Sequence, residues 1–143
     1  MKFFSVVGYA LMVLALLALV MVHGLFSSSI VIIAIQALAV ALMVWARITF
    51  GSRSFHYAAN PTEGGLVTKG PYHYIRHPIY AAIVYFTLAS VIGNWSLGNA
   101  LLWILVCAGA AVRIYCEETL LVQQYPEYVD YAKKTKRIVP FVF

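Results

Sequence analysis

The sequence has few charged side chains for its length. Of its 143 residues, 10% are charged and only five are acidic, whereas 63% are hydrophobic. A soluble domain carries about 25% charged residues, which it needs to cover its surface. The composition therefore excludes an ordinary soluble globule and predicts a membrane protein of one domain, residues 1–143.

Several kinds of functional motif are also missing. The two cysteines, Cys107 and Cys116, lie in an apolar run without the spacing of a metal knuckle, so we interpret both as small apolar residues. There is no glycine-rich dinucleotide fingerprint and no His, Cys and Glu spacing of a metal site. No nucleic-acid-binding module is recognisable, so we expect neither a metal nor a nucleic-acid partner.

What the sequence does contain is four apolar segments. They cover about residues 3–22, 30–46, 79–92 and 97–116. The first two have the length of about 17–25 residues that a membrane span needs, whereas the third is short and the fourth is borderline. The first is longer than a signal-peptide core, so we expect it to be retained. The fourth helix is expected to continue past the membrane, because good helix formers follow until Pro126.

The basic residues lie on alternate sides of these segments. Lys2, the loop 47–78 and the tail 117–143 carry Lys and Arg, whereas the other two connections carry none. This is the positive-inside pattern of four transmembrane helices with both termini cytoplasmic. The fold prediction is thus an all-α integral membrane protein, in which residues 133–137 contact anionic headgroups.

The loop 47–78 ends in a polar stretch, GPYHYIRHPIY, from Gly70 to Tyr80. Earlier in the loop, Asn60-Pro61 and Gly64-Gly65 are turn signals, and aromatic residues argue against disorder. Pro78 is well suited to the first position of the third span. His73, beside the motif, is expected to be a solvated loop histidine.

A short turn at residues 93–96 makes the third and fourth spans an antiparallel hairpin. That geometry places Arg76 and His77 at the depth of Arg113, Glu117 and Glu118. A structural role alone would pair Arg76 with one of the glutamates and use the tyrosines as an aromatic belt. Two adjacent carboxylates repel each other, however, and ionisable groups near a membrane usually mark a site, so we favour a functional cluster at the cytoplasmic interface.

The order of these residues resembles a known signature. GPYxYxRHPxY at Gly70 to Tyr80, a hydrophobic hairpin, the pair Glu117-Glu118 and a tail with Arg137-x-x-Pro140 resemble the isoprenylcysteine carboxyl methyltransferase and phospholipid methyltransferase superfamily. The resemblance covers about residues 50–140. It implies an integral membrane methyltransferase that uses S-adenosylmethionine.

The resemblance also implies roles for individual residues. The expected catalytic residues are Arg76, His77 and Glu118, and the expected cofactor-binding residues are Tyr72, Arg76, His77, Pro78, Tyr80, Glu117 and Glu118. Arg76 and His77 suit the cofactor carboxylate, and the glutamates suit its ammonium and ribose. Tyr72, Tyr74 and Tyr80 suit the sulfonium region. Tyr128 and Tyr131 share one helical face and either cap the site or pack.

The expected partners are membrane lipids and a hydrophobic or lipid-like methyl acceptor. The acceptor group is a carboxylate of isoprenylcysteine type, a phospholipid amine or a thiol, and the expected location is a bacterial or archaeal inner or plasma membrane. A longer-chain membrane reductase is a weaker enzyme alternative. The alternative from another class is a non-catalytic helical membrane protein that binds lipid or a partner, and the oligomeric state is left open.

Overall fold

The computed structural model describes residues 1–51 and 65–140, and this part of the chain is helical. Its elements are α1 Lys2–Met21, α2 Ile30–Phe50, the 3₁₀ turn η2 Gly70–His73, α3 Pro78–Gly93, α4 Leu97–Gln124 and α5 Tyr128–Lys134. The turn signals predicted at Asn60-Pro61 and at Gly64 lie outside the described residues. The all-helical prediction is confirmed for the part that is described.

Three helices, α1, α2 and α4, are long and apolar enough to cross a membrane, whereas α3 is a shorter apolar helix of 16 residues. The first apolar segment agrees with α1 to within one residue at each end, but α2 continues to Phe50, four residues past the predicted end of its span at residue 46. As predicted, α4 extends to the last residues before Pro126. Its 28 residues give about 42 Å of helix, longer than a hydrocarbon core of about 30 Å.

Helix boundaries follow local chemistry. Pro78 is the first residue of α3, where a missing N–H costs nothing. The Ser96 side chain accepts a hydrogen bond from the Asn99 backbone N–H at 3.0 Å and caps the start of α4. Gly51, with φ of 74°, ends α2 in a conformation that favours glycine. These signals set the lengths of the helices and hence the depth of their ends.

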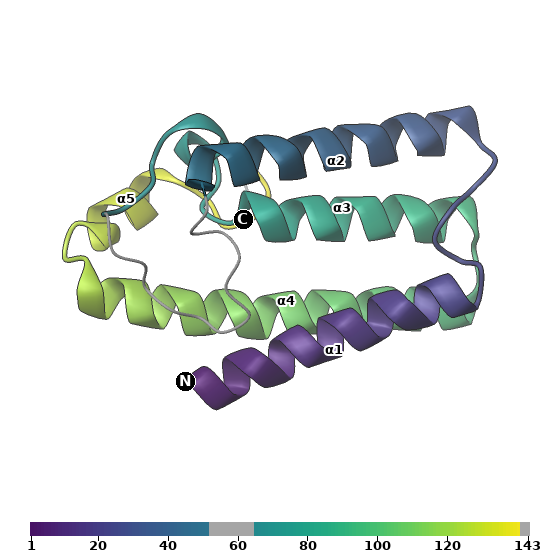
Figure 1. Cartoon of the computed structure of the whole chain (residues 1–143), viewed down its shortest axis with the longest axis horizontal. Helices are drawn as coiled ribbons and strands as arrows, with labels where there is room; N and C mark the ends of the chain where they lie inside the picture. Colours follow the sequence, from purple (N-terminus) through teal and green to yellow (C-terminus); the bar gives the residue numbers. More distant parts are fainter. Residues whose placement is uncertain (52–64, 141–143) are drawn as a thin grey trace.

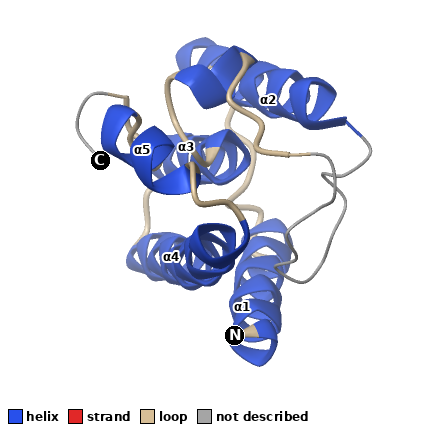
Figure 2. Ribbon diagram, turned by 90° about the vertical axis from the view of Figure 1, so that its left-hand side faces the viewer, coloured by secondary structure: helices blue, strands red, loops and turns tan. Residues whose placement is uncertain are grey.

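The helices pack as two pairs joined through the central α3–α4 hairpin. Helix α1 lies against α4, and α2 lies against α3 (Figures 1 and 2). The α1–α4 contact is very close at Gly8 and Gly109, since a Cβ atom built on Gly109 would come within 2.7 Å of the Gly8 carbonyl oxygen. Large apolar side chains point outward along the bundle, for example Leu38, Ile48 and Leu101. Such a surface suits lipid rather than water.

A polar network closes the end of the bundle where the helices turn. Gln36 Nε2 donates to the Leu25 carbonyl at 2.8 Å and to Ser90 Oγ at 3.0 Å. Asn94 Nδ2 donates to the Phe26 carbonyl at 2.9 Å, and Asn99 Nδ2 donates to the Asn94 carbonyl at 2.6 Å. These bonds satisfy polar groups that would otherwise be costly in an apolar bundle. The charged residues gather at the opposite end.

Candidate functional site

Most of the residues selected from the sequence meet where α4 projects beyond the start of α3. With two further arginines they form a single set of hydrogen bonds and ion pairs, which we call the charged cluster. Its members are Arg76, His77, Tyr80, Arg113, Glu117, Glu118 and Arg137. The predicted convergence of RHPxY and the glutamate pair is therefore present in the structure.

Glu118 is the centre of the cluster. Its Oε1 atom accepts from Arg76 Nε at 2.9 Å and lies 3.2 Å from His77 Nε2. Its Oε2 atom accepts from Arg137 Nε at 3.0 Å and from Arg137 Nη2 at 2.9 Å. The Glu118 side chain is only 15% exposed. One carboxylate thus joins α4 to the stretch before α3 and to the tail.

Glu117 has a separate set of partners. Its Oε1 atom accepts from Arg113 Nη2 at 3.0 Å and from the Tyr80 hydroxyl. Its Oε2 atom lies 3.7 Å from His77 Nδ1, beyond a normal hydrogen bond. Because each carboxylate has its own arginine, the repulsion between adjacent glutamates is offset. His77, buried between them, is the residue that both glutamates approach.

Arg113 connects the cluster to the first helix. Its Nη1 atom donates to Ser5 Oγ at 3.0 Å, and its guanidinium carbon lies 5.6 Å from the centre of the Tyr9 ring. Its Nε atom donates to the Tyr80 hydroxyl at 2.8 Å. Arg113 was predicted at this depth but not as a site residue, and no part in the site was predicted for the first apolar segment. A lone serine in an apolar run carries no sequence signal for such a contact.

The tail returns to the RHP stretch. The Arg76 and His77 backbone N–H groups donate to the Lys136 carbonyl at 2.7 Å and the Arg137 carbonyl at 2.9 Å. Arg76 Nη1 donates to the Ala132 carbonyl at 2.9 Å and to the Thr135 carbonyl. Arg76 therefore holds the tail as well as the hairpin. Its ion pair with Glu118 agrees with both predictions for Arg76, the structural one and the functional one.

Arg137 is the second cluster member that was not among the predicted site residues. It was expected to contact headgroups, but it donates two hydrogen bonds to Glu118 while its side chain stays 43% exposed. The signal that could have found it is the Arg137-x-x-Pro140 ending, which the resemblance already included.

The tyrosines of the GPYHYIRHPIY stretch differ in burial: Tyr72 and Tyr80 are buried, whereas Tyr74 is exposed. Tyr72 is buried against the Phe50 ring, with ring centres 5.5 Å apart, and its carbonyl accepts from the Tyr131 hydroxyl at 2.6 Å. Burial, and then the charge of Glu117, raises the pKa of the Tyr72 hydroxyl, so this group stays neutral. Tyr74 is exposed and lies outside the charged cluster, beside His73, which is exposed as predicted. Tyr72 and Tyr80 remain candidates for ligand contact.

Glu118 keeps its negative charge far into acid. Burial alone would raise the pKa of this carboxyl, but hydrogen bonds from His77, Arg137 and Arg76 outweigh it and hold the pKa well below its ordinary value of 4.5. About eight residues of α4 exceed the length needed to cross the membrane, and Glu118 lies in this projecting part. Glu118 is therefore ion-paired with Arg76 and Arg137 at neutral pH.

We expect the stability of the detergent-solubilised protein to fall in acid because of this group. The stabilisation from a carboxyl with a lowered native pKa is complete above its ordinary pKa of 4.5 and is lost as pH decreases toward the native value. Thermal unfolding measured between about pH 3 and pH 7 should show this loss. The variant Glu118→Gln should show a flatter profile below pH 4.5. Equal slopes for both proteins would contradict the assignment.

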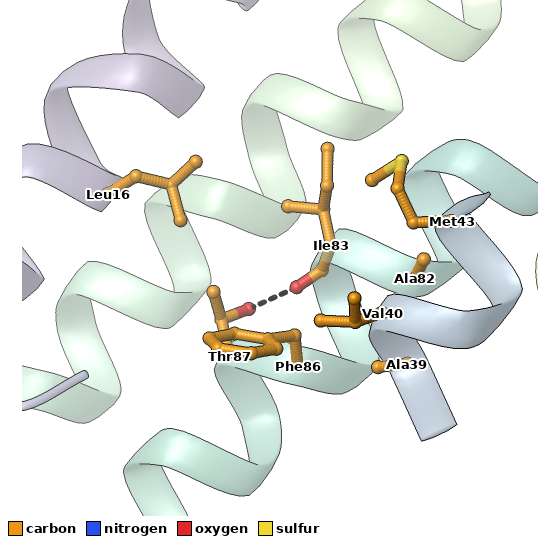
Figure 3. Close-up of a pocket in the computed structure, with 8 residues that line it drawn as sticks. All are labelled: Leu16, Ala39, Val40, Met43, Ala82, Ile83, Phe86 and Thr87. Atoms are coloured by element: carbon orange, nitrogen blue, oxygen red, sulfur yellow. Dashed lines mark hydrogen bonds between the residues drawn. The ribbon is translucent and has the colours of Figure 1, made fainter. Parts of the chain in front are cut away.

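An open apolar cavity lies between the helices and is lined in part by α3, the helix that carries Tyr80. It has a volume of about 210 Å³ and lies between α1, α2 and α3 (Figure 3). It is lined by Leu16, Ala39, Val40, Met43, Ala82, Ile83, Phe86 and Thr87. The Thr87 hydroxyl donates to the Ile83 carbonyl at 2.8 Å within its own helix, which leaves the cavity wall apolar. The wall begins with Ala82, two residues beyond Tyr80 in α3.

Within residues 1–51 and 65–140, no group of three or more His, Cys, Asp or Glu side chains has an arrangement that could hold a metal ion.

An apolar helical bundle with a buried, ion-paired cluster at one end is typical of a membrane protein. The chain belongs to the phospholipid methyltransferase family, whose model matches residues 28–128. The matched region runs from just before α2 to the first residue of α5 and includes RHPxY, the hairpin and the glutamate pair. The superfamily resemblance drawn from these residues is thereby confirmed.

Two curated bacterial proteins are similar over 89 residues. The cobalt-zinc-cadmium resistance protein CzcN of Cupriavidus metallidurans is 29% identical over 59% of this chain and 39% of its own length. The nickel-cobalt-cadmium resistance protein NccN of Alcaligenes xylosoxydans xylosoxydans is 28% identical over 59% of this chain and 40% of its own length. The matched region is thus about two fifths of each relative. No solved structure matches the chain.

Proposed function

We propose that the chain is an S-adenosylmethionine-dependent membrane methyltransferase. The observation that carries this proposal is the charged cluster, in which RHPxY and the glutamate pair of a phospholipid methyltransferase family member meet at one end of an apolar bundle. The cofactor is a zwitterion with a sulfonium, and the cluster offers arginines, a histidine, carboxylates and a tyrosine hydroxyl within one small volume. These groups fit both the anionic and the cationic parts of such a ligand.

The proposed topology has four transmembrane helices with both termini in the cytoplasm of a bacterial or archaeal cell. The N-terminus and α5 lie at the same end of the bundle as the start of α3 (Figure 1), and the basic residues follow the positive-inside pattern. Helix α3, with 16 residues, spans only about 24 Å. A helix shorter than the hydrocarbon core supports a site at the cytoplasmic interface, reached by a water-soluble cofactor from one side and by lipid from the other.

The residues would share the binding of the cofactor. Arg76 and His77 would hold its carboxylate, Glu117 and Glu118 would accept from its ammonium and ribose, and the hydroxyls of Tyr72 and Tyr80 would complete the contacts, with Pro78 fixing the start of α3. The Glu117 Oε2 atom, 3.7 Å from His77, is well placed to accept from a ligand. Because Arg76 and His77 donate to Glu118, binding requires part of the ion-pair network to exchange protein partners for ligand partners.

When bound, the cofactor supplies a methyl group on an activated sulfur leaving group. The work left to the protein is to align the acceptor in line with the methyl and to exclude water. A carboxylate or thiolate acceptor needs no general base. An amine acceptor must be neutral to attack, and His77 or a cluster glutamate is placed to take its proton.

The acceptor is proposed to be hydrophobic or lipid-like. The apolar cavity of about 210 Å³ is walled by side chains from three helices, one of which, α3, also carries Tyr80. An acyl or prenyl chain in this cavity would direct its polar head along α3 toward the charged cluster. A carboxylate of isoprenylcysteine type, a phospholipid amine and a thiol all remain acceptor groups of this proposal, because the cavity recognises the chain and not the head.

The test is ligand binding by the protein purified in detergent. Wild-type protein should bind S-adenosylhomocysteine in isothermal titration calorimetry, and Glu117→Gln should bind it about 10-fold or more weakly because a charge-assisted hydrogen bond is lost. Lys133→Gln, at an exposed ion pair, should leave the affinity unchanged.

Incubation of labelled S-adenosylmethionine with native membrane lipids should then give a labelled lipid-soluble product. If the folded wild-type protein binds neither S-adenosylmethionine nor S-adenosylhomocysteine, the alternative of a non-catalytic protein that binds lipid or a partner takes the place of this proposal.

A further inference from the structure

One buried hydroxyl beside the charged cluster has no partner. Tyr128, the first residue of α5, is 2% exposed, and its hydroxyl makes no hydrogen bond of normal geometry. It is the one buried side-chain N or O atom in this state among the described residues. Buried polar groups are nearly always hydrogen-bonded, and leaving one unsatisfied costs stability. The Tyr128 hydroxyl therefore needs an explanation.

The surroundings of Tyr128 place it at the site. Its ring meets the Tyr131 ring edge-on at 5.8 Å, and the Tyr131 hydroxyl is bonded to the Tyr72 carbonyl. Residues of the same short helix and its end hold Arg76 through backbone carbonyls. Burial, and then the charge of Glu118, raises the pKa of the Tyr128 hydroxyl, so it keeps its proton and is a donor.

No protein group nearby makes a hydrogen bond of normal geometry with this donor. The carboxylate of Glu118 is close enough to act on the hydroxyl through its charge and through a weak hydrogen-bonding contact. Its two oxygens, however, already accept from Arg76 and Arg137 and approach His77. Packing alone does not explain the hydroxyl either, because phenylalanine would fill the same space without an unsatisfied group.

We propose that the Tyr128 hydroxyl is a ligand contact that donates to the carboxylate at the amino-acid end of the cofactor. This inference rests on the proposed function and adds α5 to the site. The amino-acid end is the part assigned to Arg76, His77 and the glutamates, and Tyr128 lies against that group. The ligand reaches the hydroxyl when the ion-pair network exchanges partners, a step that cofactor binding already requires.

The experiment compares Tyr128→Phe with the wild type by calorimetric titration with S-adenosylhomocysteine. We expect Tyr128→Phe to bind about 3- to 10-fold more weakly, the loss typical of one hydrogen bond. Its melting temperature should be unchanged or higher, since no protein hydrogen bond is removed. Tyr115→Phe, at a 68% exposed position of α4, is the matched control and should bind like the wild type. Tyr131→Phe removes a hydrogen bond to Tyr72 and should lower the melting temperature instead.

Titration with 5′-methylthioadenosine, which lacks the carboxylate and ammonium, assigns the contact. Tyr128→Phe should bind this fragment as well as the wild type does. The inference is overturned if Tyr128→Phe binds S-adenosylhomocysteine normally, if it weakens both ligands equally, or if it loses thermal stability with no effect on binding. A wild-type protein that binds neither compound contradicts the proposed function itself, so the two failures are distinguishable.

Discussion

Glu118→Gln is expected to lower the stability of the detergent-solubilised protein by about 3–5 kcal/mol, the usual cost of breaking a buried ion pair from one side. The substitution removes the charge that faces Arg76, His77 and Arg137 while it keeps the size of the side chain. Arg76 and His77 are themselves buried, so water cannot replace the lost carboxylate there. Thermal unfolding followed by circular dichroism measures the effect, and binding of S-adenosylhomocysteine should be lost with it.

The matched control is Asp130→Asn. Asp130 also accepts from a basic side chain, Lys133, at 2.9 Å, but both groups are largely exposed. Exposed pairs contribute little to stability, so the melting temperature should not change measurably. Glu118→Asp, which keeps the charge, should recover part of the loss. If Glu118→Gln melts like the wild type, Glu118 is not the centre of the cluster.

Gly109→Leu is expected to separate α1 from α4 and to unfold the protein or lower its melting temperature severely. Even the first atom of the new side chain would lie 2.7 Å from the Gly8 carbonyl oxygen and 3.0 Å from the Met12 backbone nitrogen, and backbone atoms of a packed helix cannot move aside cheaply. Gly109→Ala should show the same effect more mildly, by about 1–3 kcal/mol.

The same helix offers the control. A Cβ on Gly98 would meet only Ser96 Oγ at 3.8 Å, so Gly98→Ala should be neutral or slightly stabilising. A second readout is ligand binding, because displacement of α1 would remove Ser5 and Tyr9 from Arg113. Gly109→Ala and Gly98→Ala with equal melting temperatures would contradict the close α1–α4 contact.

The part of the site that could be predicted is the part fixed by a short connection. Because residues 93–96 leave no choice but an antiparallel hairpin, the level of Arg76 relative to Glu118 follows from counting residues along two helices. The start of α3 at Pro78 and the end of α4 before Pro126 were predictable for a different reason. Proline restricts the backbone next to it, so its effect can be seen in the local sequence. Local rules and the short loop therefore account for five of the seven members of the charged cluster, namely Arg76, His77, Tyr80, Glu117 and Glu118.

The remainder depends on contacts that no local rule determines. The position of α1 against α4 is decided by the fit at Gly8 and Gly109, and only that position brings Ser5 to Arg113. Arg137 reaches Glu118 because the tail folds back along the RHP stretch. Neither contact leaves a periodic pattern in the sequence, so both were visible only in the structure.

The charged cluster is built from distant parts of the chain, and this determines when it forms during synthesis. Ser5 and Arg113 are 108 residues apart, and Arg76 and Thr135 are 59 residues apart. Glu118, the carboxylate that pairs with Arg76, lies 42 residues further along the chain and beyond α3, so it follows α3 out of the ribosome. In the proposed topology, Arg76 is until then an unpaired positive charge, which holds its end of α3 on the cytoplasmic side. The same guanidinium first directs insertion and becomes part of the site only after the ribosome has passed Arg137.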